Sequence, residues 1–258
     1  MANAPRWFTD ALAAPREDHF TDSNGTRIHY LAWGDRDKPG LVLVHGGAAH
    51  AQWWSFLAPF LATHYRVVAP DLAGHGDSGT RDHYARRGFT DDVMAVIDHA
   101  RFPGPPVLAG HSMGGLVTIV TASLHGNRLA GAIIVDAPVR KPDPESEERA
   151  DRGPVRQVRV YPDLATAMAR FRLLPAQPCE NDYIIEHIAR TSVREVEGGW
   201  RWKFDPRVFA DLSLESMHVY LASVKCRVAL VRGELSVVVP PETGEYMYEL
   251  LERNAPMV

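Results

Sequence analysis

Short apolar runs alternate with segments of helical periodicity along most of the chain. The runs lie at 41–44, 66–69, 107–109, 132–135 and 228–231, and each is apolar on both faces. Buried parallel strands have this pattern because helices cover both faces of their sheet. Upstream, Asn24-Gly25 separates the stretches 19–23 and 27–33, and an Asn-Gly pair favours a hairpin turn. The pattern predicts an α/β fold with a mostly parallel sheet and an antiparallel hairpin at one edge.

Three helices are predicted between and after these strands. Apolar residues recur at helical spacing over 89–100, with Thr90 as the expected N-cap, and again over 116–124. A third stripe ends near 251 and opens at Pro240-Pro241, where proline suits the first turn of a helix.

Residues 139–211 interrupt the alternation. They begin with a charged, proline-rich stretch, continue with helix-like pieces at 163–174 and 181–196, and end in the aromatic patch GGWRWKFDP. We predict a helical cap insertion over the carboxyl edge of the sheet, where α/β proteins bind ligands. The domain prediction is therefore a core over 1–138, a cap over 139–211 and a second core part over 212–258. A surface excursion without a binding role is the alternative.

Composition narrows the class of protein. The net charge of −4, from 28 basic and 32 acidic residues, offers no electrostatic footprint for nucleic acid. The two cysteines, Cys179 and Cys226, form neither a disulfide framework nor a metal-binding pair. No apolar stretch is long enough for a signal peptide or a membrane span. The expected location is cytoplasmic, with no membrane partner.

The strongest chemical signal is the segment Gly110-His-Ser-Met-Gly114, which follows one apolar run and precedes a helical stripe. Strand, sharp turn and helix are the context in which G-x-S-x-G forms a nucleophile elbow, with the serine oxygen projecting from the sheet. Small residues two before and two after Ser112 let the strand and helix backbones approach each other. The motif predicts Ser112 as a nucleophile.

A second signal is His45-Gly46-Gly47, at the end of the run 41–44. An oxyanion hole needs a backbone N–H that reaches the substrate without a side chain in the way. We predict the N–H groups of Gly47 and Met113 as its donors and Gly46 as a substrate contact. His45 is expected to hold the loop by hydrogen bonds.

The third signal is the segment Asp71-Leu-Ala-Gly-His-Gly-Asp-Ser-Gly79. It contains G-x-G-x-x-G, the dinucleotide fingerprint, which requires a helix to start at the glycines. The next ten residues are polar and the helix is expected near Thr90, so a nucleotide site is disfavoured.

Taken in this order, HGG, DLAGHGDSG and GHSMGG resemble the α/β-hydrolase superfamily, and the patch GGWRWKFDP resembles the cap of a bacterial branch. The resemblance covers roughly residues 20–258. It implies the α/β-hydrolase fold, with an acid and a histidine that complete a triad with the serine. It implies neither a metal nor an organic cofactor.

The resemblance puts the acid at position 237, in a stretch that here reads Arg-Gly-Glu-Leu-Ser-Val. Val237 accepts no hydrogen bond and does not fill this role. Asp136, at the end of the run 132–135, is the best alternative acid, and a loop-capping aspartate is the competing interpretation. Glu234 is a weaker candidate.

The resemblance puts the histidine beyond a last strand, whose start we see at 255–258. The chain holds twelve histidines, and none lies after His218. We therefore expect the last strand, the histidine loop and the terminal helix to be missing, as in a truncated hydrolase. His187, in the cap, is the remaining candidate for the base, and His111 is expected to point away from the reacting face. A bare sheet edge would favour self-association.

The resulting hypothesis is a hydrolase that cleaves a small, fairly apolar ester or related carbonyl substrate through Ser112. Serine at the elbow disfavours the aspartate-nucleophile enzymes of the superfamily, while lyase and carbon–carbon hydrolase chemistry stay open. The cap residues Trp200 and Trp202 are candidates for an apolar substrate pocket, and core packing explains them equally well. The rival hypothesis is a non-catalytic ligand-binding or interaction protein that keeps the fold and lacks the triad.

Overall fold

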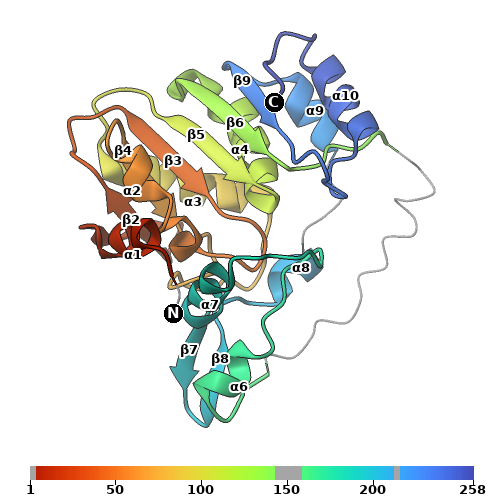
Figure 1. Ribbon diagram of the computed structural model, residues 1–258. Coiled ribbons are helices and arrows are strands. Elements are labelled where there is room, and N and C mark those ends of the chain that lie inside the picture. The colour runs from red at the N-terminus through yellow and green to blue at the C-terminus, as the bar shows by residue number, and fades with distance from the viewer. Residues whose placement is uncertain (1–3, 143–158, 212–215) are drawn as a thin grey trace.

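The computed structural model describes residues 4–142, 159–211 and 216–258. Its centre is a seven-stranded sheet in the order β1-β2-β4-β3-β5-β6-β9 (Figure 1). The strands are β1 (Glu17–Ser23), β2 (Thr26–Trp33), β3 (Gly40–Val44), β4 (Arg66–Pro70), β5 (Val107–His111), β6 (Gly131–Val135) and β9 (Val228–Val231). All seven lie where the apolar runs and the Asn-Gly turn predict them.

The sheet combines an antiparallel edge with a parallel body. β1 and β2 form a hairpin around Asn24 and Gly25, which both have positive φ angles. β2 also pairs antiparallel with β4, and the remaining neighbours are parallel. The carboxyl ends of β3, β5, β6 and β9 therefore meet at one edge of the sheet.

Helices cover both faces of the sheet. One face packs against α3 (Arg86–Ala100), α4 (Met113–His125), α9 (Met217–Ala222) and α10 (Pro241–Leu250), and the other against η1 (Ala51–Trp54) and α2 (Ala58–Leu61). A short turn of helix, η2 (Gly126–Arg128), follows α4. Alternate residues of each strand serve the two faces: Val42 and Val44 join the first core, and Leu41 and Leu43 the second. Two-sided burial explains why these strands are apolar throughout.

The start of α3 differs from the prediction. The helix begins at Arg86 after the extended residue Ala85, one turn before Thr90. Thr90 is buried within the helix, and its hydroxyl accepts a hydrogen bond from Thr121 of α4. The first turn carries polar residues that face solvent, so apolar periodicity does not reveal it.

Between β6 and β9 the chain leaves the sheet and forms a separate layer beyond its carboxyl edge (Figure 1). This layer contains α6 (Leu164–Met168), α7 (Asp182–Thr191), α8 (Arg207–Asp211) and a hairpin of β7 (Val193–Val196) and β8 (Gly199–Trp202). The prediction of helix through 196 was wrong at its end, because the positive φ angles of Gly198 and Gly199 turn this segment into a hairpin. Most of the charged run at 141–151 lies outside the described residues.

Near its two ends the described chain adds a short helix and a stretch that pairs with β9. α1 (Arg6–Ala13), which the apolar pattern did not predict, buries Phe8 against Phe56 and Ile188 of α7. Residues 256–258 run parallel to β9, with hydrogen bonds that join Leu230 to Pro256 and Val258. The predicted strand start at 255–258 is thereby confirmed. Within the described segments no helix is both long and apolar enough to cross a bilayer.

Candidate active site

Ser112 lies between β5 and α4 in a backbone conformation that few L-residues adopt. Its φ is 53° and its ψ −120°, and its N–H donates to the carbonyl of Val135 on the neighbouring strand at 2.9 Å. Such strain costs on the order of 1–3 kcal/mol and persists only where the surroundings fix it. The predicted strand-turn-helix context of Ser112 is present.

The glycines around Ser112 are required by close backbone contacts. A β-carbon on Gly110 would overlap the carbonyl of Gly114, and one on Gly114 would lie 2.5 Å from the carbonyl oxygen of Val44. A β-carbon on Gly115 would overlap that of Ala137. The turn therefore brings β3, β5 and α4 together more closely than side chains permit.

The glycine loop after β3 lies directly beside this turn. A β-carbon at Gly46 would lie 3.4 Å from Cβ of Ser112, and one at Gly47 would lie 3.8 Å from Cβ of Met113. The two predicted oxyanion donors, the N–H groups of Gly47 and Met113, thus belong to adjoining segments. Gly46, the predicted substrate contact, adjoins Ser112 itself.

His45 holds the glycine loop in place by hydrogen bonds. It is 1% exposed, its Nδ1 lies 2.7 Å from the carbonyl of Gly46, and its Nε2 accepts from the N–H of Leu72 at 3.1 Å. Burial lowers its pKa to about 4, so the ring is neutral at pH 7. A neutral ring donates through Nδ1 and accepts through Nε2, which supports the predicted loop-holding role.

Asp71 organises the loop after β4. Its carboxylate accepts from the N–H groups of Ala51 and Asp77 and lies 2.6 Å from Nδ1 of His29. Burial opposes the charged form, but these donors and the His29 ring hold the pKa of Asp71 well below its usual range. The buried carboxylate of Asp71 therefore fixes the DLAGHGDSG segment, which follows β4.

Asp136 follows β6, one residue after the carbonyl that binds the N–H of Ser112. Its carboxylate accepts from the Ser236 hydroxyl at 2.9 Å, and more weakly from the N–H of Gly233 at 3.4 Å. Asp136 thus holds the loop in which the family pattern expects the acid, while Val237 is 74% exposed. These contacts are those of a loop-capping aspartate.

The two candidate histidine bases lie in different places. The ring of His111 lies beside the glycine loop, where its Nδ1 is 3.1 Å from a β-carbon placed on Gly46. His187 is buried against α1 and η1, where its Nε2 lies 2.9 Å from the Ser55 hydroxyl and 3.2 Å from the carbonyl of Gln52. His111 is half-buried, which lowers its pKa. Among the residues that the structure describes, none hydrogen-bonds to the hydroxyl of Ser112. His187 is unsuitable as a base because its ring is already engaged elsewhere.

Trp200 and Trp202, the two candidates for an apolar substrate pocket, lie on β8. Trp202 packs within the cap, against Tyr161 and Phe171, and the Trp200 backbone pairs with that of Tyr161. The ring of Phe209 on α8 is the one that reaches the glycine loop, 2.9 Å from a β-carbon placed on Gly47. Sequence reasoning missed Phe209, since a single phenylalanine outside the aromatic patch gives no signal of its own.

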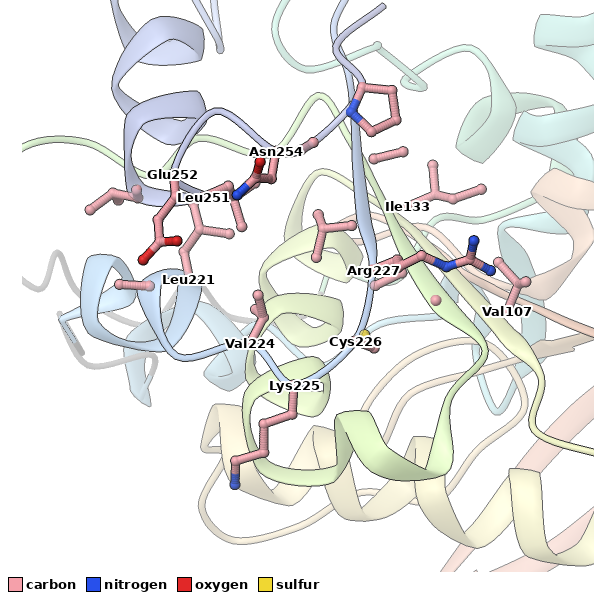
Figure 2. A pocket seen from close by; sticks show the side chains of 18 of the residues that line it. Val107, Ile133, Leu221, Val224, Lys225, Cys226, Arg227, Leu251, Glu252 and Asn254 are labelled. Atoms are coloured by element: carbon pink, nitrogen blue, oxygen red, sulfur yellow. The ribbon is translucent and has the colours of Figure 1, made fainter.

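A large groove in the described part of the chain lies away from Ser112. It has a volume of about 860 Å³ and is lined by residues that include Val107, Ile133, Leu221, Cys226 and Leu251 (Figure 2). Val107 begins β5, whereas Ser112 follows its end. The groove therefore opens by the amino ends of the strands and does not contain the elbow.

His29, Asp71 and Asp77 form the one group of potential metal ligands found in the described ranges. The His29 ring already bonds to Asp71 and, at 2.9 Å, to Asp18. Asp77 is paired with Lys203 at 2.8 Å. These partners occupy the ligand atoms, so the group is an internal hydrogen-bond network.

Comparison with known proteins identifies several relatives. The chain is 36% identical over 115 residues to the dihydrolipoyllysine-residue acetyltransferase component of the acetoin cleaving system of Pseudomonas putida, which covers 43% of this chain and 30% of the relative. It is 35% identical over 127 residues to a bifunctional esterase/perhydrolase of Acinetobacter calcoaceticus, covering 46% and 44%. The chain spans about a third of the length of the first of these relatives.

Solved structures match over almost the whole chain. A thioesterase domain from the curacin biosynthetic pathway superposes with a TM-score of 0.78 at 26% identity, covering 95% of this chain and 92% of that one. An E-2-(acetamidomethylene)succinate hydrolase has a TM-score of 0.76 at 20% identity, covering 95% and 90%, which is evidence for the fold alone. The sequence model of the alpha/beta hydrolase family matches residues 41–251. The chain therefore belongs to the alpha/beta hydrolase family.

Proposed function

We propose that this protein hydrolyses a small, fairly apolar ester or related carbonyl compound with Ser112 as nucleophile. The observation that carries the proposal is the strained backbone of Ser112, at φ 53°, beside the glycine loop after β3. A protein without covalent chemistry has no need to keep a serine in this conformation. The esterase among its relatives supports the same reaction class.

In the proposed reaction the Ser112 oxygen attacks the carbonyl carbon, and the N–H groups of Gly47 and Met113 bind the oxyanion that forms. Two such donors are worth several kcal/mol, since losing one oxyanion-hole donor in a serine protease costs about 3–4 kcal/mol. Collapse expels the alcohol, and water then releases the acid. The Ser112 proton passes to water, and the departing alkoxide takes a proton from water to leave as the alcohol. We assign Asp136, which follows the strand beside Ser112, as the acid of the site.

Cleavage of a short p-nitrophenyl ester by the wild-type chain, beside Ser112→Ala, tests the proposal. Intact mass is recorded for both, since an acyl group on the serine adds its own mass even where turnover is slow. We expect acylation or turnover in the wild type and neither in the variant. Ser223→Ala, at the end of α9, is the control for folding and should react like the wild type. A folded wild-type chain that is never acylated would exclude Ser112 as a nucleophile.

The second candidate function is ligand binding without catalysis. The unpartnered Ser112 hydroxyl, within the described residues, and the exposed Val237 at the expected acid position favour it. The same mass experiment separates the two functions. Saturable binding of an ester analogue without acylation would identify a binding protein, whereas acylation of Ser112 would identify an enzyme.

Phe209 is proposed as the wall of the acyl pocket because its ring covers Gly47. Phe209→Ala should raise KM for esters of apolar acids about tenfold and change kcat little, since a hydrophobic contact contributes roughly 1–3 kcal/mol of binding. Phe60→Ala is the matched control: its ring is 52% exposed, against 50% for Phe209, and it packs on Trp7 of α1. Equal kinetics of the two variants would place the acyl pocket elsewhere.

We assign residues 139–211 to a cap, because α8 carries Phe209 to the glycine loop. Self-association at the edge formed by β9 and residues 256–258 is the proposed mode of assembly, and Val258 there is 81% exposed. A small-molecule substrate is the partner that the family implies.

A further inference from the structure

A second cavity lies between the cap hairpin and the loop after β4. Its volume is about 300 Å³, at the lower end of the range for small-molecule sites. One wall is formed by Gly74 and Thr80 of the loop, and the other by β7, β8 and the residues that follow them. We call it the cationic pocket, because four basic side chains line it: Arg194, Arg201, Lys203 and Arg207.

The acidic residues near this pocket balance only part of its charge. Asp205 is the one carboxylate in the lining, and it forms a forked pair with Arg207 at 2.6–3.1 Å. Asp77 lies beside the pocket and pairs with Lys203 at 2.8 Å and, more distantly, with Arg194 at 3.9 Å. The carboxylate of Asp82 also acts on the charge of Arg207. Four cations and three anions leave an excess of about one positive charge in a partly enclosed space, where screening by water is reduced.

Arg201 is the least compensated of the four. Its guanidinium has neither a hydrogen bond nor a carboxylate within 4.0 Å among the residues that the structure describes, and its Nε is buried without a partner. The Nε of Arg194 is likewise buried and unpaired, although its terminal nitrogen donates to the carbonyl of Gly76. Buried donors almost always have acceptors, so these two arginines call for an acceptor that the described residues do not supply.

The pocket is held in shape by contacts that do not involve Arg201. The N–H of Gly76 donates to the carbonyl of Lys203 at 2.8 Å, and the N–H of Asp205 donates to that of Gly74 at 2.7 Å. The Tyr84 hydroxyl donates to Asp205 at 3.0 Å. A site that is already formed binds without a large cost of ordering.

We propose that the cationic pocket binds the oxyanion group, a carboxylate or a phosphate, of a small acidic molecule. Arginine suits both groups because its planar fork donates two parallel hydrogen bonds. The lining of the pocket contains neither Ser112 nor Gly47. Two aromatic rings lie between the two places: Phe204 in the lining packs on Phe209, at 6.2 Å between ring centres, and Phe209 covers Gly47. Binding there does not depend on Ser112.

Calorimetric titration of the full chain with inorganic phosphate, and separately with acetate, at low ionic strength tests this site. We expect saturable binding that weakens with added salt. Arg201→Met should weaken it by about 10- to 100-fold, the contribution of a hydrogen bond to a charged group. Arg190→Met is the matched control, because Arg190 lies on α7, 53% exposed and paired with Glu186, outside the pocket lining. Ser112→Ala should bind like the wild type.

The thermal midpoint of Arg201→Met provides the folding control. Since the side chain of Arg201 makes no polar contact with the described residues, its removal should leave the midpoint unchanged or raise it, and phosphate should then stabilise the wild type alone. Tighter binding of phosphate than of acetate would identify a phosphorylated ligand. Equal binding of the two anions would identify a ligand with a carboxylate. No saturable binding in the millimolar range, or equal binding by the wild type and Arg201→Met, would overturn the site.

Discussion

Gly114→Ala should destabilise the folded protein by about 3 kcal/mol or more, even though alanine is the better helix former by roughly 1 kcal/mol. The added β-carbon would lie 2.5 Å from the carbonyl oxygen of Val44 and closer still to that of His45. Both atoms belong to the backbone at the end of β3, which cannot rotate away as a side chain does. Relief requires a shift of α4 or of the glycine loop, and either shift moves Ser112 relative to Gly47.

The matched control is Gly244→Ala, which also lies within a helix. Its β-carbon would meet nothing nearer than the flexible Arg232 side chain at 3.4 Å. We expect a gain of about 0.5–1 kcal/mol from helix propensity. Urea unfolding followed by circular dichroism measures both variants. A Gly114→Ala chain as stable as Gly244→Ala would contradict the close packing of β3 against α4.

The elbow and the glycine loop could be predicted because their chemistry is local. The positive φ of Ser112 and the close approach of Gly110 to Gly114 involve residues within a few positions, and a motif of five residues specifies them. The contact of Gly114 with Val44 joins distant segments, but both lie in motifs that the sequence displays. The sheet could be predicted for a related reason: burial on both faces forces every strand position to be apolar, and this leaves a continuous run in the sequence.

The remaining site residues depend on contacts between distant segments. His187 is a histidine in a cap helix, and only the fold shows that its ring bonds to Ser55, 132 positions away. Asp136 and Ser236 are 100 positions apart, and the parallel pairing of β6 with β9 brings them together. Phe209 lies on α8, and only the fold brings its ring to Gly47. Such contacts leave no periodic pattern, so the sequence suggested Trp200 and Trp202 instead.

Arg81→Met should lower the free energy of unfolding by about 3–5 kcal/mol at neutral pH, because it leaves the buried carboxylate of Asp92 without its counter-ion. Asp92 is fully buried on α3 and pairs with Arg81, and it also accepts from the N–H of Ala73 at 3.0 Å. Arg81 further donates to Thr26 at 3.0 Å. The pair therefore ties the loop after β4, which carries the DLAGHGDSG segment, to both α3 and the edge hairpin.

The matched control is Arg128→Met. Its partner Asp98 has a side chain that is 60% exposed, and Arg128 itself is 45% exposed. An exposed pair of this kind contributes at most about 1 kcal/mol, because water screens both charges. If chemical unfolding gave the same loss of unfolding free energy for Arg81→Met and Arg128→Met, burial of Asp92 would not determine the size of that loss.

The loss in Arg81→Met should also depend on pH. Burial raises the pKa of Asp92 in the folded protein above its ordinary value, and the charge of Arg81 opposes this shift. Without Arg81 the folded-state pKa rises further, so the folded chain binds the proton more tightly than the unfolded chain. The penalty is absent below the unfolded pKa, near 4, and grows as pH rises toward the folded pKa. The free energy of unfolding lost in Arg81→Met should therefore be smaller at pH 4.5 than at pH 7.5. A loss that does not depend on pH would mean that Arg81 stabilises the loop through its other hydrogen bonds and not through the charge of Asp92.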